Sequence, residues 1–157
     1  MKKLTPAEAK GKIQRYCAYQ ERSHQEVKNK LFEYGLYSDD VDSLMTDLIT
    51  DGFLNEERYA KAFAGGKFRM KKWGRIKIVN ALEAQGLSKN CIKIGLKEID
   101  SEDYVATLRQ VLQKKGEEVE EENIFAKRDK ISKYAIHKGY EPELVWHTLK
   151  ELFPDKG

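Results

Sequence analysis

The sequence predicts an all-α protein made of three tandem three-helix repeats that form an elongated, curved body. Three observations predict this fold class. Charged residues make up 35% of the 157 residues, above the roughly 25% of an average domain, which fits a large solvated surface around a small core. Helix-capping patterns occur along the whole chain, and no stretch is convincing as a strand. A pattern of glycines and apolar residues also recurs three times.

The recurring pattern is centred on Gly35, Gly86 and Gly139, which are 51 and 53 residues apart. Apolar residues stand eight and four positions before each glycine, and six, ten and thirteen positions after it. These spacings place apolar side chains on one face of each of two helices joined at the glycine. The fifteen positions are Val27, Leu31, Val41, Met45 and Leu48, then Ile78, Leu82, Ile92, Leu96 and Ile99, then Ile131, Ala135, Val145, Leu149 and Leu152.

A further helix precedes each pair, which gives nine predicted helices. The three units are predicted over residues 1–52, 53–100 and 101–157, and their first helices over about 6–20, 56–72 and 102–115. A unit of this size is marginal alone, so neighbouring units are expected to support each other. Gly65 and Gly66 lie inside the fourth helix, at a cost of about 1 kcal/mol each relative to alanine. They predict either a kink or the close approach of another backbone.

The predicted helix starts carry a side chain that can cap the first turn, followed by acidic residues that favour the positive helix end. These caps are Thr5, Ser23, Ser38, Asn55 and Ser101. At Thr5 and Ser23 a glutamate stands three residues later, which completes a capping box.

Several classes of protein are excluded by the composition. Uninterrupted aliphatic or aromatic runs reach only about four residues, whereas a membrane span needs about 20. Residues 1–14 contain lysines but no apolar segment of a secretory signal. Cys17 and Cys91 are 74 residues apart, which favours buried thiols in a reducing compartment over a disulfide or a metal site. The sequence predicts a cytoplasmic protein without membrane contact, and its high charge content favours a monomer.

The sequence also lacks patterns that carry catalysis. The three histidines, His24, His137 and His147, have no metal-ligand spacing, and there is no phosphate-binding loop or nucleophile elbow. We therefore predict no catalytic residue, no metal and no cofactor, and expect that the protein is not an enzyme.

Positive charge is concentrated in the middle unit. Residues 53–100 contain 11 basic and 5 acidic side chains, a balance of +6, against −1 before this segment and −2 after it. Six cations and no acid occur between Lys67 and Lys77. Around Trp73 we predict a turn that brings cations from two helices to one edge. Composition alone is equally compatible with a plain solvated surface, whereas the functional interpretation is contact with a polyanion or an acidic protein.

The candidate contact residues follow from this stretch. Arg22, at the first turn between helices, is a secondary candidate. Trp73 is a possible aromatic anchor among the cations. The full set is Arg22, Lys67, Arg69, Lys71, Lys72, Trp73, Arg75 and Lys77.

Three segments resemble the RecX family, whose members modulate the RecA recombinase. They are residues 16–35, 48–87 and 127–149, and they span most of the chain. The middle segment carries the most specific motif, which here reads Glu57-Arg58-Tyr59-Ala60, Arg69, Trp73-Gly74 and Arg75-Ile76. The Gly65-Gly66 pair and the alanine at position 135 depart from the family pattern.

The resemblance implies three tandem three-helix repeats, in agreement with the repeat described above. It also implies binding to RecA filaments on single-stranded DNA and inhibition of recombinase, ATPase and coprotease activity, and thereby modulation of recombination and DNA repair in the SOS response. The alternative is a direct nucleic-acid-binding protein that uses its units like helix-turn-helix modules. Weak direct binding to DNA, alongside tight binding to the filament, would favour the regulator.

Overall fold

The structure, a computed structural model, describes residues 3–155. These residues form nine α-helices and no strand, so the all-α prediction is confirmed. The helices are α1 (Pro6–Tyr19), α2 (His24–Glu33), α3 (Ser38–Thr50), α4 (Glu56–Lys71), α5 (Arg75–Ala84), α6 (Lys89–Leu96), α7 (Ser101–Glu118), α8 (Ile124–His137) and α9 (Pro142–Leu152).

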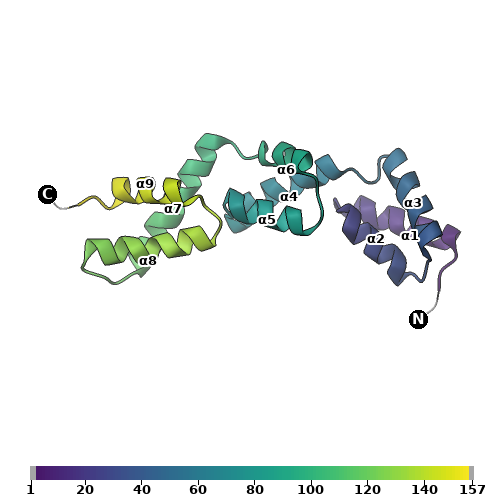
Figure 1. The fold of residues 1–157 in the computed structure, drawn as a ribbon, viewed down its shortest axis with the longest axis horizontal. Helices are drawn as coiled ribbons and strands as arrows, with labels where there is room; N and C mark the ends of the chain where they lie inside the picture. The colour runs from purple at the N-terminus through teal and green to yellow at the C-terminus, as the bar shows by residue number, and fades with distance from the viewer. Residues whose placement is uncertain (1–2, 156–157) are drawn as a thin grey trace.

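The helices follow one another along an elongated body, with α1 to α3 at one end and α7 to α9 at the other (Figure 1). The main contacts between helices lie within successive groups of three. We call these the N-terminal group (α1–α3), the middle group (α4–α6) and the C-terminal group (α7–α9). In the middle group α4 packs most closely on α6. A Cβ on Gly95 of α6 would lie only 2.7 Å from the carbonyl oxygen of Ala60 of α4.

The repeated apolar positions lie on the inner faces of their helices, as predicted. Twelve of the fifteen are buried, and Met45, Leu96 and Leu152 are half-buried. The three central glycines end the preceding helices with φ angles of 88°, 83° and 103°, in the left-handed region that other residues rarely adopt. The repeat thus predicts both which side chains are buried and where the two helices of each pair are joined.

The helix starts show where local patterns identify a cap and where they do not. Three predicted caps are confirmed, namely Thr5, Ser23 and Asn55. The predictions for Ser38 and Ser101 are wrong, since both lie inside the first turn. Tyr37 is the N-cap of α3 and makes no side-chain bond, whereas the side chain of Asp100 caps α7. α3 and α7 therefore each begin one residue earlier than their cap patterns suggest.

The core consists of two apolar clusters rather than three. One joins α1 to α3 and includes Ile13, Leu31 and Leu48. The other extends through all six remaining helices, from Tyr59 to Leu149. The middle and C-terminal groups therefore share one core, while the N-terminal group has its own.

Three aromatic rings connect the middle group to the C-terminal group. Phe68 of α4 lies 5.9 Å from Tyr104 of α7, and Tyr104 lies 5.2 Å from Tyr140, measured between ring centroids. Tyr104 and Tyr140 are completely buried. Such tilted ring pairs add to the free energy gained by burial alone.

The turn before α5 also pairs with the turn before α9 through the backbone. The N–H of Gly74 donates to the carbonyl of Lys138 at 2.8 Å, and the N–H of Ile76 donates to that of Gly139 at 2.9 Å. This approach requires glycine, because a Cβ on Gly74 would lie 2.2 Å from the carbonyl carbon of Gly139. The junction between the two groups is therefore closed by main-chain contact as well as by apolar packing.

Polar contacts join the N-terminal group to the middle group. Arg58 of α4 pairs with Glu21, and it also donates to the carbonyl of Gly52 at 3.0 Å. His24 lies 3.6 Å from Glu56. This junction is weaker than the other, since partly exposed ion pairs contribute about 0–1 kcal/mol each.

The glycine pair in α4 serves neither predicted purpose. The helix is continuous from Glu56 to Lys71, and no other backbone approaches either glycine within the described residues. Over Gly65 lies the guanidinium of Arg69, 2.8 Å from where a Cβ would stand, whereas a Cβ on Gly66 would meet nothing within 4 Å. The close helix contact is instead at Gly95, which the sequence did not single out.

The two cysteine thiols are free. Cys17 is buried in the N-terminal cluster, and burial raises its pKa to about 11. Cys91 is only half-buried, so the prediction of two buried thiols holds fully for Cys17 alone.

Candidate functional site

The predicted turn between α4 and α5 is confirmed, and it has an unusual backbone. Lys72 ends α4 with a φ of 56°, which makes it the one non-glycine residue with positive φ among residues 3–155. Its carbonyl accepts a hydrogen bond of 2.8 Å from the hydroxyl of Tyr140. The junction with the C-terminal group thus fixes a lysine in a left-handed conformation that costs an L residue about 1–2 kcal/mol.

This strain predicts that Lys72→Gly stabilises the fold. We expect the free energy of unfolding to rise by about 1 kcal/mol, because glycine adopts this conformation without a steric penalty. Urea unfolding followed by circular dichroism measures the change. Lys72→Ala is the matched control, since it removes the same charge and keeps the strain; equal stability of the two variants would contradict the explanation.

Trp73 lies between two of the predicted cations. The ammonium groups of Lys67 and Lys77 stand 5.0 and 4.7 Å from the centroid of its ring, within cation–π range. Lys67 also lies 5.5 Å from the ring of Phe63. Trp73, Lys67 and Lys77 are all half-buried. The structure therefore brings Trp73 and cations from both helices to one edge, as expected for the turn.

The side chain of Arg75 is partly exposed, but it is held by contacts within the protein. Its guanidinium donates to Glu141 at 2.9 Å and lies 3.8 Å from the ring of Tyr104. The hydroxyl of Tyr104 in turn donates to Glu141 and accepts from the backbone N–H of Arg75. Burial alone would raise the pKa of Glu141, but the hydrogen bonds from Tyr104 and Arg75 outweigh it and lower that pKa. Arg75 is thus foremost a link between α5 and the start of α9.

The lowered pKa of Glu141 predicts a pH-dependent loss of stability. A carboxyl group whose pKa is lowered by folding stabilises the fold at pH values above its pKa in the unfolded chain, near 4.5. This contribution disappears as the pH falls through the pKa of the folded state. We expect Glu141→Gln to cost about 2 kcal/mol at pH 7, the scale of a hydrogen-bonded charge pair. In unfolding experiments between pH 7 and 3, the difference from wild type should shrink below pH 4.5.

The neighbouring carboxylate Glu143 provides the control for this prediction. It is exposed and forms no ion pair among the described residues. Glu143→Gln should leave the stability nearly unchanged at all pH values. A cost for Glu141→Gln that persists at pH 3 would show that the lost interaction is not ionic.

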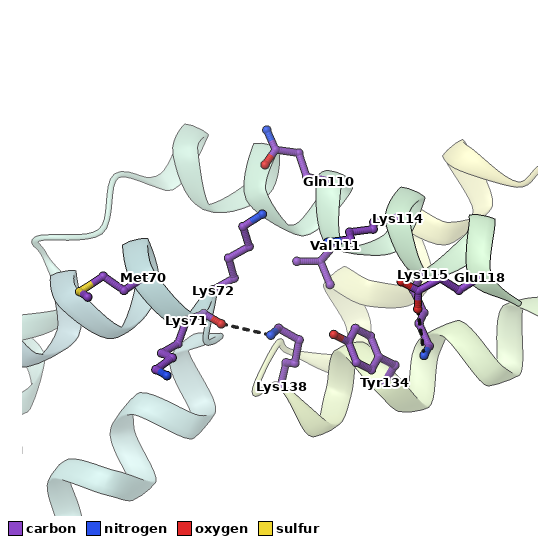
Figure 2. A pocket seen from close by; sticks show the side chains of 10 residues that line it. All are labelled: Met70, Lys71, Lys72, Gln110, Val111, Lys114, Lys115, Glu118, Tyr134 and Lys138. Atoms are coloured by element: carbon purple, nitrogen blue, oxygen red, sulfur yellow. Dashed lines mark hydrogen bonds and ion pairs between the residues drawn. The ribbon is translucent and has the colours of Figure 1, made fainter.

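Five lysines line a pocket of about 270 Å³ between the end of α4, α7 and α8. We call it the lysine pocket; its lysines are Lys71, Lys72, Lys114, Lys115 and Lys138. Figure 2 shows the amine of Lys72 extending toward α7, whereas that of Lys71 points away from it. The one acidic side chain in the lining, Glu118, pairs with Lys115 at 3.4 Å. Positive charge therefore exceeds negative charge by four in this pocket.

The lysine pocket crowds like charges together. The ammonium of Lys138 donates to the carbonyl of Lys71 at 3.1 Å, as the dashed line in Figure 2 shows. Burial lowers the pKa of Lys138, and the charges of Lys77 and Lys72 lower it further. A bound anion would relieve this repulsion and raise that pKa. The pocket therefore has the electrostatics of a site for phosphate or carboxylate groups.

The remaining predicted residues lie in different surroundings. Arg69 is exposed on α4 and lines a shallow pocket with Lys72. Arg22 is 13% exposed; it lies 3.7 Å from the ring of Tyr16, donates to that residue's carbonyl and pairs with Glu26. Arg22 therefore supports the turn between α1 and α2, and the structure does not bring it into the lysine pocket.

Sequence reasoning missed the contribution of the C-terminal group. Lys114 and Lys115 begin a segment whose glutamates give it an acidic character, and Lys138 stands alone in the sequence. Only the junction between the C-terminal group and the end of α4 brings these three lysines to Lys71 and Lys72. A charge count along the chain gives no signal for such a cluster.

No helix among residues 3–155 has the length and apolar character needed to cross a bilayer. In the same part of the chain no set of three or more histidine, cysteine or acidic side chains is arranged to hold a metal ion.

Known proteins resemble this chain in both sequence and fold. A family model described as the second three-helix domain of RecX matches residues 55–96, from the N-cap of α4 to the end of α6. The regulatory protein RecX of Clostridium perfringens is 30% identical over 133 residues, which are 83% of this chain and 62% of that protein. The protein of the same name from Clostridium acetobutylicum is 27% identical over 139 residues, 85% of this chain and 64% of that protein.

Relatives differ in how much of their length the chain spans. It covers less than two thirds of the two clostridial proteins, but 88% of the regulatory protein RecX of Prosthecochloris aestuarii, at 24% identity and with 87% of this chain matched. The crystal structure of RecX from Lactobacillus salivarius has the same fold, with a TM-score of 0.85 at 20% identity, covering 94% of this chain and 96% of that one.

The fold and the lysine pocket define a class of protein: an elongated array of three-helix groups with a basic surface at the junction of the last two. Relatives that match along most of the chain are named regulatory proteins. The chain is similar to the RecX family along most of its length, and its middle group matches the second three-helix domain of that family.

Proposed function

We propose that this protein binds RecA filaments on single-stranded DNA and lowers their recombinase, ATPase and coprotease activity. It would thereby modulate recombination and DNA repair, as a monomer in the cytoplasm. The names of its relatives support a regulatory role. The units over residues 1–52, 53–100 and 101–157 would lie along the filament and contact more than one protomer.

The observation that carries the proposal is the unpaired positive charge around the turn between α4 and α5. Among the described residues, the predicted cations Lys67, Arg69, Lys71, Lys72 and Lys77 form no ion pair, and of that stretch Arg75 alone does. A surface that keeps several cations without internal carboxylates is suited to an acidic partner, because complementary charge steers and strengthens association. Phosphates of DNA and carboxylates of RecA both fit.

Co-sedimentation with RecA on single-stranded DNA tests the proposal. We expect the protein to pellet with filaments formed in the presence of a slowly hydrolysed ATP analogue. In a separate assay with ATP, we expect it to slow ATP hydrolysis by RecA. Wild-type protein that stays in the supernatant at micromolar concentration and leaves ATP hydrolysis unchanged would exclude this function.

Direct binding to nucleic acid is the second candidate, and the lysine pocket supports it. Four lysines without an acidic partner can neutralise several phosphates, and their affinity would then fall linearly with salt concentration on logarithmic axes. A titration with bare single-stranded DNA separates the two candidates. A filament regulator should bind the filament far more tightly than bare DNA at physiological salt.

A further inference from the structure

A further hollow lies on the outer face of α4, next to the lysine pocket, with which it shares Met70 and Lys71. It has a volume of about 190 Å³ and is lined by Ala62, Phe63, Gly66, Lys67, Met70 and Lys71. We call it the α4 groove. Ala62, Gly66 and Met70 are four residues apart and form one row of the helix, and the other three form the adjacent row. The hollow exists because Gly66 has no side chain between Ala62 and Met70.

Nothing within the described protein explains the glycine at this position. A Cβ on Gly66 would meet no atom within 4 Å, whereas at Gly95 it would lie 2.7 Å from Ala60. Glycine is unfavourable inside a helix, and only proline is worse. Next to it Met70 is 82% exposed, so most of this large apolar side chain is left uncovered. An occupant of the groove would use both features, because it would cover Met70 and approach the helix backbone at Gly66.

The charges around the groove indicate the chemistry of its occupant. Lys67 and Lys71 border it, and neither forms an ion pair among residues 3–155. An apolar centre between two ammonium groups is complementary to an apolar side chain with carboxylates beside it. An unpaired nucleobase fits less well, because bases stack on open aromatic faces. The rings of Phe63 and Trp73 are instead approached by the ammonium group of Lys67, at 5.5 and 5.0 Å.

We propose that the α4 groove receives an apolar side chain from an acidic protein segment of the partner. The proposal rests on the proposed function, because it places that segment on RecA. It adds that this part of the contact is made with protein rather than with DNA. The apolar anchor lies over Gly66 against Phe63 and Met70, and the carboxylates pair with Lys67 and Lys71.

Filling the groove tests the proposal with variants that keep the fold. Gly66→Leu places a branched side chain in the hollow, and Gly66→Ala adds one methyl group. A Cβ at position 66 would meet nothing within 4 Å, and both variants replace glycine with a better helix former, so the melting temperature should rise. We expect the affinity for RecA filaments to fall about tenfold for leucine, the scale of one lost interface anchor, and less for alanine. Binding to bare single-stranded DNA should not change.

Gly11→Ala is the matched control, because Gly11 lies inside α1 and its Cβ would meet only the end of the Arg15 side chain, at 3.7 Å. It should also stabilise the protein, and it should leave filament binding intact. If wild type does not bind filaments, the proposed function fails. If wild type binds and Gly66→Leu binds equally well, the α4 groove is not a docking site. Loss of binding to bare DNA by Gly66→Leu would overturn the protein nature of the occupant.

Discussion

Replacing Gly74 with alanine is expected to destabilise the protein by about 3 kcal/mol or more. The added Cβ would lie 2.2 Å from the carbonyl carbon of Gly139 and 2.3 Å from the nitrogen of Tyr140. Both are backbone atoms and cannot turn aside, so the two turns must separate. Overpacking costs about 1–3 kcal/mol, and each lost backbone hydrogen bond adds about 1 kcal/mol. Urea unfolding monitored by circular dichroism measures the loss.

Gly86→Ala separates this clash from backbone strain. Gly86 has a φ of 83°, but a Cβ there would meet nothing within 4 Å, so alanine should cost only the 1–2 kcal/mol of a left-handed residue. Gly74 has an ordinary φ of −79° and carries no such strain. The ranking of the two variants therefore tests the close approach of the turns, and a smaller cost for Gly74→Ala would contradict it.

Reversing two charges of the lysine pocket is expected to weaken filament binding at least about tenfold and to abolish the inhibition of RecA. Lys72→Asp with Lys114→Glu replaces two exposed cations that have no ion-pair partner in the described part of the chain. Aspartate tolerates the left-handed backbone at position 72, so the fold should be kept. Attraction to an acidic partner becomes repulsion, and at least 1.4 kcal/mol of binding free energy is lost for a tenfold change. Filament affinity and ATPase inhibition are the measurements.

The matched control is Lys28→Glu with Lys89→Glu. Both residues are exposed, lie on α2 and α6 away from the pocket lining, and give the same change in net charge. If the control weakens binding as much as the pocket variant, net charge rather than the lysine pocket determines affinity. Arg75 is not a suitable target for charge reversal, because its loss would also leave Glu141 unpaired.

The sequence predicts what depends on local periodicity. Burial at Val27, Ile78 and Ile131 follows from apolar spacing, and the positive φ of Gly35 follows from its place after a helix. The caps show the limit of this reasoning. Ser101 and Asp100 are both good capping residues, and the choice between them depends on where the first turn meets the rest of the fold.

The site could be predicted only in part, because its partners are distant in sequence. The cations from Lys67 to Lys77 stand out along the chain, but the bond from Arg75 to Glu141 spans 66 residues. Lys138 reaches the α4–α5 turn only because Gly139 allows two turns to meet. Neither fact is encoded in a spacing that one sequence reveals.

The middle and C-terminal groups share one core. Truncation from the C-terminus should therefore destabilise the protein more than truncation from the N-terminus. A version that stopped after Asp100 would lose Tyr104 and Tyr140, and the apolar surface around Phe68 would face water. Such a fragment should aggregate. A version that started near residue 53 would give up mainly the polar contacts of Arg58 and Glu56. The smallest fragment that keeps the shared core intact is therefore expected to consist of the last two groups together.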